Sequence, residues 1–188
     1  PKPSSAASDV YKRQELEDRC FAELKPETRD SILKRLKLIY SQDEFNIPII
    51  TKELETFLKK NNINCVILGR VKSSYSIWKK MQFKNLSMDQ LSDIMAFRII
   101  VDDVNECYTT LGLLHQKYSA IMGRFKDYIS APKRNGYQSL HSSLIGPKKT
   151  RIEVQIRTSV MNEFALNGVA AHWIYKEGGK SSETIRYK

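Results

Sequence analysis

The densest group of chemically useful side chains lies in residues 123–141, which contain four lysines or arginines, two tyrosines and a histidine. Asn135 and Gly136 predict a tight turn inside this run, because both residues tolerate positive φ. Cations in such a loop can bind phosphates, and an exposed ring such as Tyr137 can stack on a nucleobase. The run therefore fits a nucleotide-binding loop. A solvated hairpin with one surface tyrosine fits the same spacing, so the pattern alone leaves both interpretations open.

A second candidate for phosphate binding is the junction between a predicted strand, residues 63–71, and the helix that follows it. A serine-rich turn caps this helix, and Ser76 and Lys80 lie four residues apart on one helical face. Together with Arg70 and Lys72 they could face a free helix N-terminus, which is a favourable place for a phosphate. The Gly-Lys-Ser/Thr of a Walker loop is absent. A capped surface helix is the alternative interpretation.

Two acidic residues could complete a metal site between these cations. Asp93 lies near the start of the apolar strand predicted over residues 91–101, and Glu153 lies on the polar face of a strongly alternating strand, residues 150–157. If the two carboxylates converge, they can hold Mg²⁺ among phosphates. The alternatives are an Asp93 that ends its element and pairs with Arg98, and a solvated polar face around Glu153.

Helical and alternating patterns predict the elements that must position these residues. Amphipathic periodicity predicts helices over residues 15–40, with a break at Pro26, and over 47–60, 104–118 and 158–175. Further strands are predicted over residues 125–130 and from about Tyr137 onwards. Residues 1–14 lack an apolar period, look like non-native sequence and are expected to be disordered, and residues 177–188 are expected to form a flexible tail.

The composition bounds the class of protein. A chain of 188 residues with 41% hydrophobic residues suits one domain with an appended segment. No apolar run is long enough to span a membrane, and no signal peptide opens the chain. The formal net charge of +10 favours polyanionic partners, which include nucleotides, nucleic acids and acidic lipids. Three widely spaced cysteines indicate reduced thiols and a cytoplasmic location.

Five blocks of the sequence, in this order, resemble the signatures of the RelA/SpoT family of alarmone synthetases. The blocks are residues 69–81, 93–99, 123–141, 153–158 and 168–173. The resemblance implies an α/β (α+β) fold in which a mixed sheet of about five strands is flanked by helices, similar to nucleotidyltransferases. It also implies transfer of the β,γ-pyrophosphate of ATP to the 3′-hydroxyl of GTP or GDP, which gives (p)ppGpp and AMP in stringent-response alarmone synthesis.

The resemblance implies roles for individual residues as well. Asp93 and Glu153 would ligate Mg²⁺, or Mn²⁺ in its place, and Glu153 would be placed to accept the proton of the 3′-hydroxyl. Arg124 and Lys126 would stabilise the charge of the group in transfer. The implied ATP-binding residues are Arg70, Lys72, Ser76, Lys80 and Arg98. The implied GTP-binding residues are Lys133, Asn135, Tyr137, Gln138, His141, Gln155 and Arg157.

The chain resembles an internal piece of a long, multidomain member of this family. Residues 15–62 are similar to the helical segment that joins a hydrolase domain to the synthetase domain, which would occupy residues 63–176. Residues 124–127, Arg-Phe-Lys-Asp, are similar to a sub-motif of bifunctional synthetase-hydrolases. None of the three histidines is followed by Asp, so the His-Asp pair of the hydrolase metal site is absent. Contact with the ribosome or other nucleic acid would depend on missing C-terminal domains, and self-association stays open.

The function expected from these observations is that of a cytoplasmic, Mg²⁺-dependent GTP pyrophosphokinase (GTP diphosphokinase) domain that binds ATP and GTP or GDP, and no membrane. A catalytically idle nucleotide- or RNA-binding module is the first alternative, and the net charge supports it. Such a surface has no need of two carboxylates, Asp93 and Glu153, in a basic cleft. The second alternative is a nucleotidyltransferase that releases pyrophosphate instead of AMP.

Overall fold

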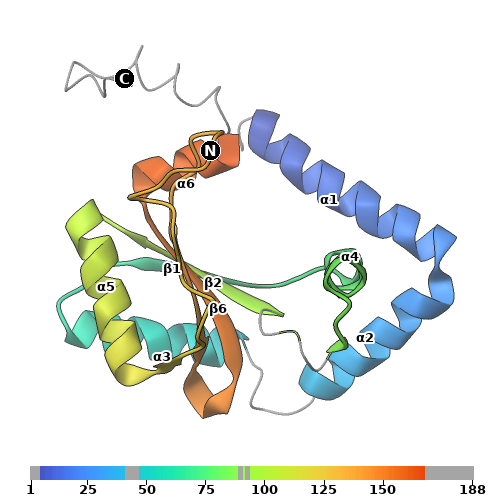
Figure 1. The fold of residues 1–188 in the computed structure, drawn as a ribbon, viewed down its shortest axis with the longest axis horizontal. Coiled ribbons are helices and arrows are strands. Elements are labelled where there is room, and N and C mark those ends of the chain that lie inside the picture. Colours follow the sequence, from blue (N-terminus) through green and yellow to red (C-terminus); the bar gives the residue numbers. More distant parts are fainter. Residues whose placement is uncertain (1–4, 41–46, 89–90, 92–93, 168–188) are drawn as a thin grey trace.

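The computed structural model describes residues 5–40, 47–88, 91 and 94–167 (Figure 1). Its α-helices are α1 (Ser5–Leu24), α2 (Pro26–Tyr40), α3 (Ile47–Lys60), α4 (Ser74–Lys84), α5 (Val104–Lys117) and α6 (Ser159–Asn167), and Pro147–Lys149 form a 3-10 helix. Its strands are β1 (Val66–Val71), β2 (Met95–Val101), β3 (Ser119–Ala120), β4 (Lys126–Asp127), β5 (Leu140–Ile145) and β6 (Arg151–Thr158). None of the described helices is long and apolar enough to cross a membrane.

The strands form one mixed sheet. Its order is β1-β2-β6-β5-β3, and β4 pairs with β5. β2 and β6 run parallel, while the other pairs are antiparallel. The expected fold of a mixed sheet flanked by helices is therefore confirmed. Of the six strands, β3 and β4 contain only two residues each, so four longer strands make up most of the sheet.

One face of the sheet is apolar and is covered by α3 and α5 (Figure 1). Alternation along β6 turns Ile152, Val154 and Ile156 to this face, where they are fully buried. Leu54 of α3 and Leu114 of α5 pack into the same cluster. Each such side chain contributes about 1.5–3 kcal/mol when it leaves water, so this cluster is the main core of the fold.

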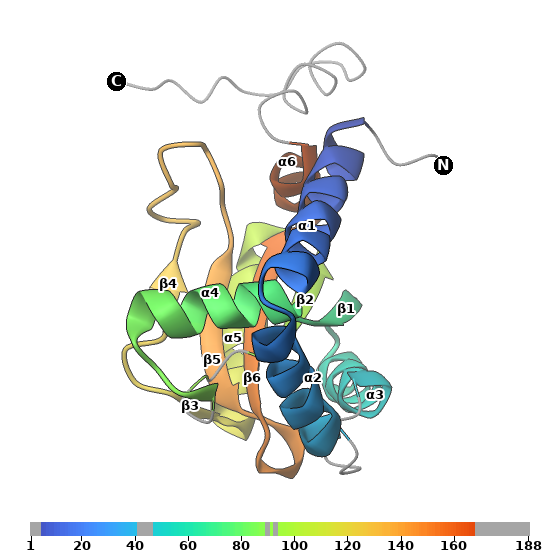
Figure 2. The same cartoon turned by 90° about the vertical axis from the view of Figure 1, so that its right-hand side faces the viewer.

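A second apolar cluster joins α1, α2 and α4, which Figure 2 shows in front of the strands. The ring of Phe21 on α1 lies 5.2 Å from the ring of Trp78 and 5.8 Å from that of Tyr75, both on α4. Ile32 and Leu36 of α2 are buried beside them. The three helices thus support one another through their own core, apart from the core under the sheet.

The second face of the sheet carries polar side chains in its centre. The register places Gln155 of β6 between Arg98 of β2 and His141 of β5, and directly opposed residues share a face. Glu153 lies two residues before Gln155 and therefore points to the same side. The pairing of three strands thus gathers four polar residues from distant parts of the sequence.

The ends of the chain differ in part from the prediction. α1 begins at Ser5, so residues 5–14, for which disorder was predicted, are helical in the structure. The break at Pro26 is present, because α1 ends at Leu24 and α2 begins with the proline. The closing helix is described as far as Asn167. Residues 1–4 and the predicted tail, residues 177–188, lie outside the described residues.

The central loop is also longer than predicted. The strand expected over residues 125–130 is limited to β4, because the Asp127 carboxylate accepts hydrogen bonds from the amides of Ile129 and Ser130 and turns the chain. The strand expected from Tyr137 begins only at Leu140. The intervening residues, 128–139, form a hairpin-like loop. The Tyr128 amide donates to the Ser139 carbonyl at its base, and the Lys133 amide donates to the Tyr137 carbonyl near its tip.

Gly136 is needed where this loop meets α6. Its φ of +76° is strained for other residues, and a Cβ at this position would lie 2.8 Å from the ring of Phe164 on α6. Gly123 has a similar φ of +71°, but among the described residues nothing lies within 4 Å of its would-be Cβ. Substitution at Gly123 therefore introduces backbone strain alone, whereas substitution at Gly136 adds a steric clash with Phe164.

Gly136→Ala is expected to destabilise the fold more than Gly123→Ala. Positive φ costs alanine about 1–2 kcal/mol at either position, and the clash with Phe164 adds about 1–3 kcal/mol at Gly136 alone. Urea unfolding of both variants measures the difference in the free energy of unfolding. Equal losses for the two variants would show that α6 moves aside without cost, and would contradict the prediction.

Candidate active site

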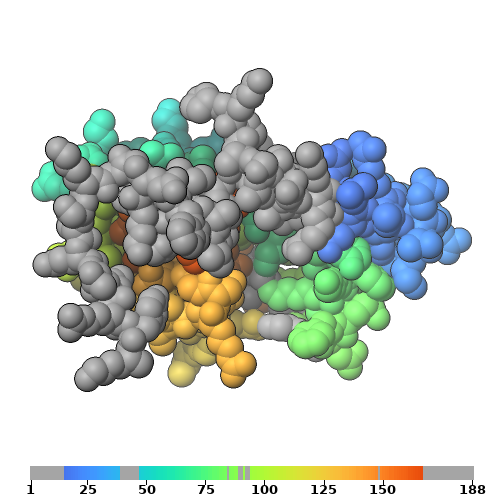
Figure 3. All heavy atoms as spheres, turned by 90° about the horizontal axis from the view of Figure 1, so that it is seen from above, coloured from blue at the N-terminus to red at the C-terminus, as the bar shows by residue number. Residues whose placement is uncertain are grey.

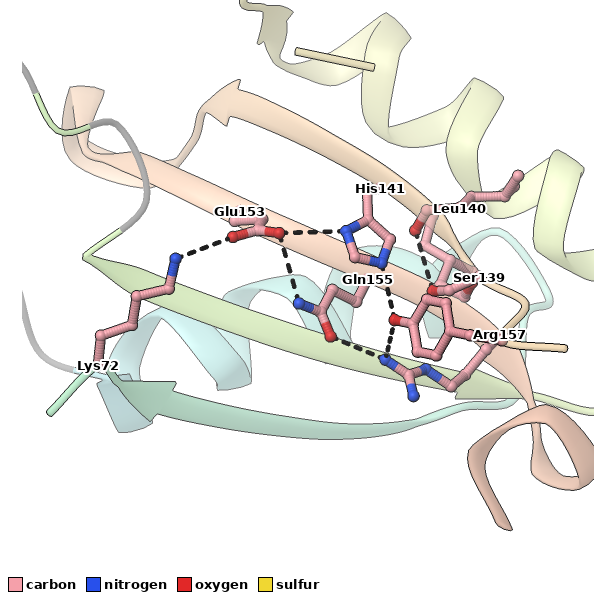
Figure 4. A network of polar contacts seen from close by, with 9 residues as sticks. Lys72, Ser139, Leu140, His141, Glu153, Gln155 and Arg157 are labelled. Atoms are coloured by element: carbon pink, nitrogen blue, oxygen red, sulfur yellow. Dashed lines mark hydrogen bonds and ion pairs between the residues drawn. The ribbon is translucent and has the colours of Figure 1, made fainter. Parts of the chain in front are cut away.

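The Glu153 carboxylate lies at the centre of the polar face (Figure 4). Lys72 Nζ lies 3.5 Å from Oε2, and His141 Nδ1 lies 3.3 Å from Oε1. Gln155 Nε2 donates a hydrogen bond to Oε1 at 3.4 Å. The Glu153 side chain is only 16% exposed. It is therefore a half-buried carboxylate that three donors surround.

These donors keep Glu153 ionised. Burial raises the pKa of the carboxyl group, but the hydrogen bond with His141 and the charge of Lys72 outweigh burial, and the pKa falls to about 2. A group with so low a pKa carries a full negative charge at neutral pH. It is a good ligand for a cation and a weak general base, because an efficient base has a pKa near the working pH.

A chain of hydrogen bonds leads from Glu153 to a buried arginine. The Tyr137 hydroxyl lies 2.8 Å from His141 Nε2, and Arg157 Nη2 donates to the same hydroxyl at 3.0 Å. Arg157 Nη2 also donates to Gln155 Oε1 at 2.8 Å. The contacts among Arg157, His141, Gln155 and Glu153 can be followed in Figure 4. The structure thus brings five of the predicted site residues, or six with Lys72, into one network.

The polar face has a strongly positive character. Arg157 is 2% exposed, and burial lowers its pKa; the nearby charges of Arg98 and Arg70 lower it further, while Tyr137 opposes them. Three guanidinium groups close enough to affect one another create a positive potential on this side of the sheet. A polyanionic ligand would relieve their mutual repulsion.

The loop over residues 128–139 places a cation on aromatic rings. Lys133 Nζ lies 5.0 Å from the centroid of the Tyr137 ring and 4.6 Å from that of Tyr128. The other two loop residues that were predicted to bind GTP stabilise the loop. Asn135 Oδ1 accepts a hydrogen bond from the Tyr137 amide, and Gln138 Nε2 donates to a backbone carbonyl of the loop. Figure 3, in which the loop is gold and α4 is green, shows the two segments on the same side of the molecule.

Helix α4 carries two of the predicted ATP-binding residues. Ser73 caps the helix, because its Oγ accepts a hydrogen bond from the Ser76 amide at 3.3 Å, and the two hydroxyl groups lie 3.0 Å apart. Lys80 lies one turn further along the helix. Lys72 precedes the cap and reaches the Glu153 carboxylate. The predicted serine cap of α4 is therefore present, and Lys72 connects this junction with the polar face.

The N-terminus of α4 is not free, and this part of the prediction is wrong. Asp18 of α1 accepts a hydrogen bond from the Tyr75 amide at 3.1 Å and another from the Ser74 hydroxyl at 2.8 Å. The other oxygen of Asp18 lies 3.9 Å from Arg29 Nη2. A carboxylate from α1 thus occupies the place where a phosphate was one of the two interpretations, and the capped helix is the one that the structure bears out.

The cations of the sub-motif lie at the edge of the polar face. Lys126 of β4 is exposed and pairs in register with His141, so the two residues share a face. Arg124 is half-buried in the turn before β4. Their role in charge stabilisation stays a prediction.

A metal site can be assessed from one carboxylate only, because Asp93 lies outside the described residues. Within the described part of the chain, no group of three or more His, Cys, Asp or Glu side chains could hold a metal ion. Glu153 fits as a single carboxylate ligand, because its negative charge is maintained by its neighbours. The remaining ligands would then come from Asp93, the substrate phosphates and water.

Sequence reasoning missed two residues at this site. Tyr128 lies 5.3 Å from His141 between ring centroids, and its place two residues after Lys126 in the basic run could have indicated it. Asp18 lies 57 residues before the amide that it caps, so nothing local in the sequence indicated the contact.

A mixed sheet with one covered face and an ionised carboxylate among cations on the other suits a domain that handles nucleotide phosphates. The sequence profile of the region found in RelA/SpoT proteins matches residues 69–180 of the chain. The chain therefore belongs to the RelA/SpoT family, as the motifs indicated.

The curated relatives described next are considerably longer than the chain. A GTP pyrophosphokinase rsh of Brucella ovis is 44% identical over 170 residues, which are 90% of this chain and 23% of the relative. The bifunctional (p)ppGpp synthase/hydrolase SpoT of Escherichia coli is 44% identical over 176 residues, which are 94% of this chain and 25% of the relative. The chain thus spans about a quarter of the length of the curated relatives that it matches.

Solved structures agree on the fold. Small alarmone synthetase 1 of Bacillus subtilis, bound to its product pppGpp, has a TM-score of 0.57 and 25% identity, covering 79% of this chain and 83% of that chain. Small alarmone synthetase 2 of the same organism has a TM-score of 0.58 and 28% identity, with coverages of 77% and 80%. The mixed fold is therefore that of the synthetase domains in this family.

Asp18→Ala is expected to lower the free energy of unfolding by about 1–2 kcal/mol, because it leaves an amide of the first turn of α4 without its acceptor. Glu15→Gln is the matched control on the same helix, since it removes only an exposed ion pair with Arg19, which contributes less than about 1 kcal/mol. Urea unfolding measures both variants. Equal effects would show that Asp18 has no special part in holding α4.

Proposed function

We propose that this chain is the synthetase domain of a longer protein and transfers the β,γ-pyrophosphate of ATP to the 3′-hydroxyl of GTP or GDP. The observation that carries this proposal is the ionised Glu153 among Lys72, His141 and the arginines of the polar face. The names of the relatives and the product in the solved synthetase support it. Residues 15–62 then lead from a preceding domain into the synthetase domain, as the short coverage of the relatives suggests.

The main obstacle to this reaction is the repulsion between the negatively charged phosphates of the two nucleotides. Pyrophosphoryl transfer brings the phosphates of two nucleotides together, and its catalysis depends on positioning and on positive charge rather than on covalent help. Membership of the family implies a divalent metal ion, and we infer Mg²⁺, with Mn²⁺ as a substitute. Glu153 and Asp93 would hold this ion, which when bound would neutralise charge on the phosphates. The low pKa of Glu153 favours this ligand role over that of a base.

The two nucleotides bind on opposite sides of Glu153. Arg70, Lys72 and Arg98 are assigned to ATP, together with Ser76 and Lys80 of α4. GTP or GDP binds beside the loop over residues 128–139, where Tyr137 stacks on guanine, and Lys133 and His141 lie beside the ring. Asn135 and Gln138 act through the shape of the loop, and Arg124 and Lys126 face the group in transfer.

The strongly basic composition also suits a module that binds nucleotides or RNA without turnover. That alternative gives no reason for a carboxylate to be kept ionised inside a basic face, because such a group repels a polyanion. A nucleotidyltransferase would use a similar carboxylate but would release pyrophosphate. The products of the reaction therefore decide between the three functions.

Mass spectrometry of the nucleotides after incubation with ATP, GTP and Mg²⁺ is the direct test. We expect AMP and a guanosine pentaphosphate in equal amounts. Release of pyrophosphate from ATP would identify a nucleotidyltransferase instead. Nucleotides that bind but stay intact would leave the idle module as the function of this chain, and would overturn the proposal.

Glu153→Gln is expected to abolish turnover and to leave guanine-nucleotide affinity nearly unchanged, because the amide keeps the shape of the side chain but loses the charge that binds the metal ion. Steady-state kinetics and calorimetry with GTP measure the two effects. Glu53→Gln is the matched control, since Glu53 contacts Tyr118 and Lys117 away from the polar face. Retained turnover in Glu153→Gln would remove Glu153 from the mechanism.

A further inference from the structure

Tyr137 takes part in two kinds of contact at once. Its ring carries the Lys133 contact on the loop, and its hydroxyl joins the hydrogen-bond chain that ends at Glu153. Stacking on a base requires only the ring. Nucleotide affinity therefore does not explain why the Tyr137 hydroxyl is bonded to His141 and Arg157.

The donor and acceptor atoms determine the direction of each hydrogen bond between Arg157 and Glu153. An arginine can only donate, so the Tyr137 oxygen accepts the hydrogen bond from Arg157. An ionised carboxylate can only accept, so His141 Nδ1 carries the proton that faces Glu153. In a neutral imidazole Nε2 is then an acceptor, and the Tyr137 hydroxyl donates to it at 2.8 Å. Each of the three contacts in this arrangement then has one donor and one acceptor.

We propose that Tyr137 is a positioning residue as well as a stacking residue: its hydroxyl, held by Arg157, fixes His141 with Nδ1–H directed at Glu153. This inference depends on the proposed function for its catalytic consequence, but not for its structural part. The buried Arg157 acts through Tyr137 and Gln155, to which its Nη2 atom donates. The side chain that receives the guanine base thereby also orients the carboxylate at the reacting centre.

Tyr137→Phe tests this role because it keeps the ring and removes only the hydroxyl. We expect an unchanged Kd for GTP and a kcat lowered by about 10- to 100-fold, the range found when a partner that orients a catalytic ligand is removed. Tyr137→Ala removes the ring too, and its Kd for GTP should rise by about 5- to 150-fold, equivalent to 1–3 kcal/mol. Calorimetry and steady-state kinetics separate affinity from turnover.

Tyr118→Phe is the matched control. It also removes a tyrosine hydroxyl that bonds to a glutamate, with 3.0 Å between the Tyr118 and Glu53 oxygens, but Tyr118 belongs to the core on the other face of the sheet. Its kcat should equal that of the unchanged chain. A similar loss of kcat in both variants would attribute the effect to general destabilisation and would overturn the inference.

The tautomer of His141 gives a readout that does not depend on activity. Nitrogen-15 spectra of the histidine rings, recorded at a pH where the imidazoles are neutral, should show His141 protonated on Nδ1 with a hydrogen-bonded Nε2 in the unchanged chain. In Tyr137→Phe the Nε2 signal should move to that of an imidazole nitrogen without a hydrogen-bond donor. The chain has three histidines, so His141→Gln assigns the signal. An unchanged His141 spectrum in Tyr137→Phe, or an unchanged kcat, would overturn the inference. If the unchanged chain itself makes no AMP, the proposed function fails, while the spectra still decide whether the hydroxyl positions His141.

Discussion

A negative charge in a nearly enclosed place is the constraint on which the site depends. Leaving water penalises the charge of Glu153, so the carboxylate stays ionised only while donors surround it. Those donors come from three places in the chain, after β1, on β5 and on β6. A slip of one residue in the pairing of β6 would turn Glu153 into the apolar core. The register of the central strands is therefore as much a part of the site as the residues themselves.

The register in turn depends on the contrast between the two faces of the sheet. Fully buried side chains of β6 alternate with the polar ones, and α3 and α5 cover only the apolar set. On the other side, α1, α2 and α4 form a core of their own, separate from the core between the sheet and α3 and α5. α1 and α2 precede the residues that match the family profile, yet Asp18 and Phe21 hold α4 in place. A boundary drawn at residue 63 would therefore remove part of the support for α4, which carries two of the residues assigned to ATP.

Local patterns in the sequence predicted most of the helices and strands, and the family motifs predicted which residues lie together in the site. The alternation over residues 150–157 was enough to predict β6 and its two faces, and the serine-rich turn was enough to predict the cap of α4. The loop over residues 128–139 was missed because a carboxylate, Asp127, ends β4 by a side-chain contact that no hydrophobic pattern contains. Likewise, the contact between Asp18 and α4 joins two helices distant in sequence. Spacing alone could not show that His141 faces Glu153, since that pair depends on the strand order.

The Glu153 carboxylate has its donors in place before any nucleotide is present, and this has a consequence for substrate binding. Lys72 neutralises Glu153 in the structure, and Lys133 lies on the ring assigned to guanine. If the proposed function holds, a cation at Glu153 competes with Lys72, and Lys72 becomes available for the phosphates of ATP. Glu153 then passes from Lys72 to the metal ion, and Lys72 passes from Glu153 to the phosphates. Both side chains already lose water when the protein folds, so substrate binding adds little further desolvation of these two groups. Under that function the site can receive two polyanions while Glu153 and Lys72 each keep a charged partner.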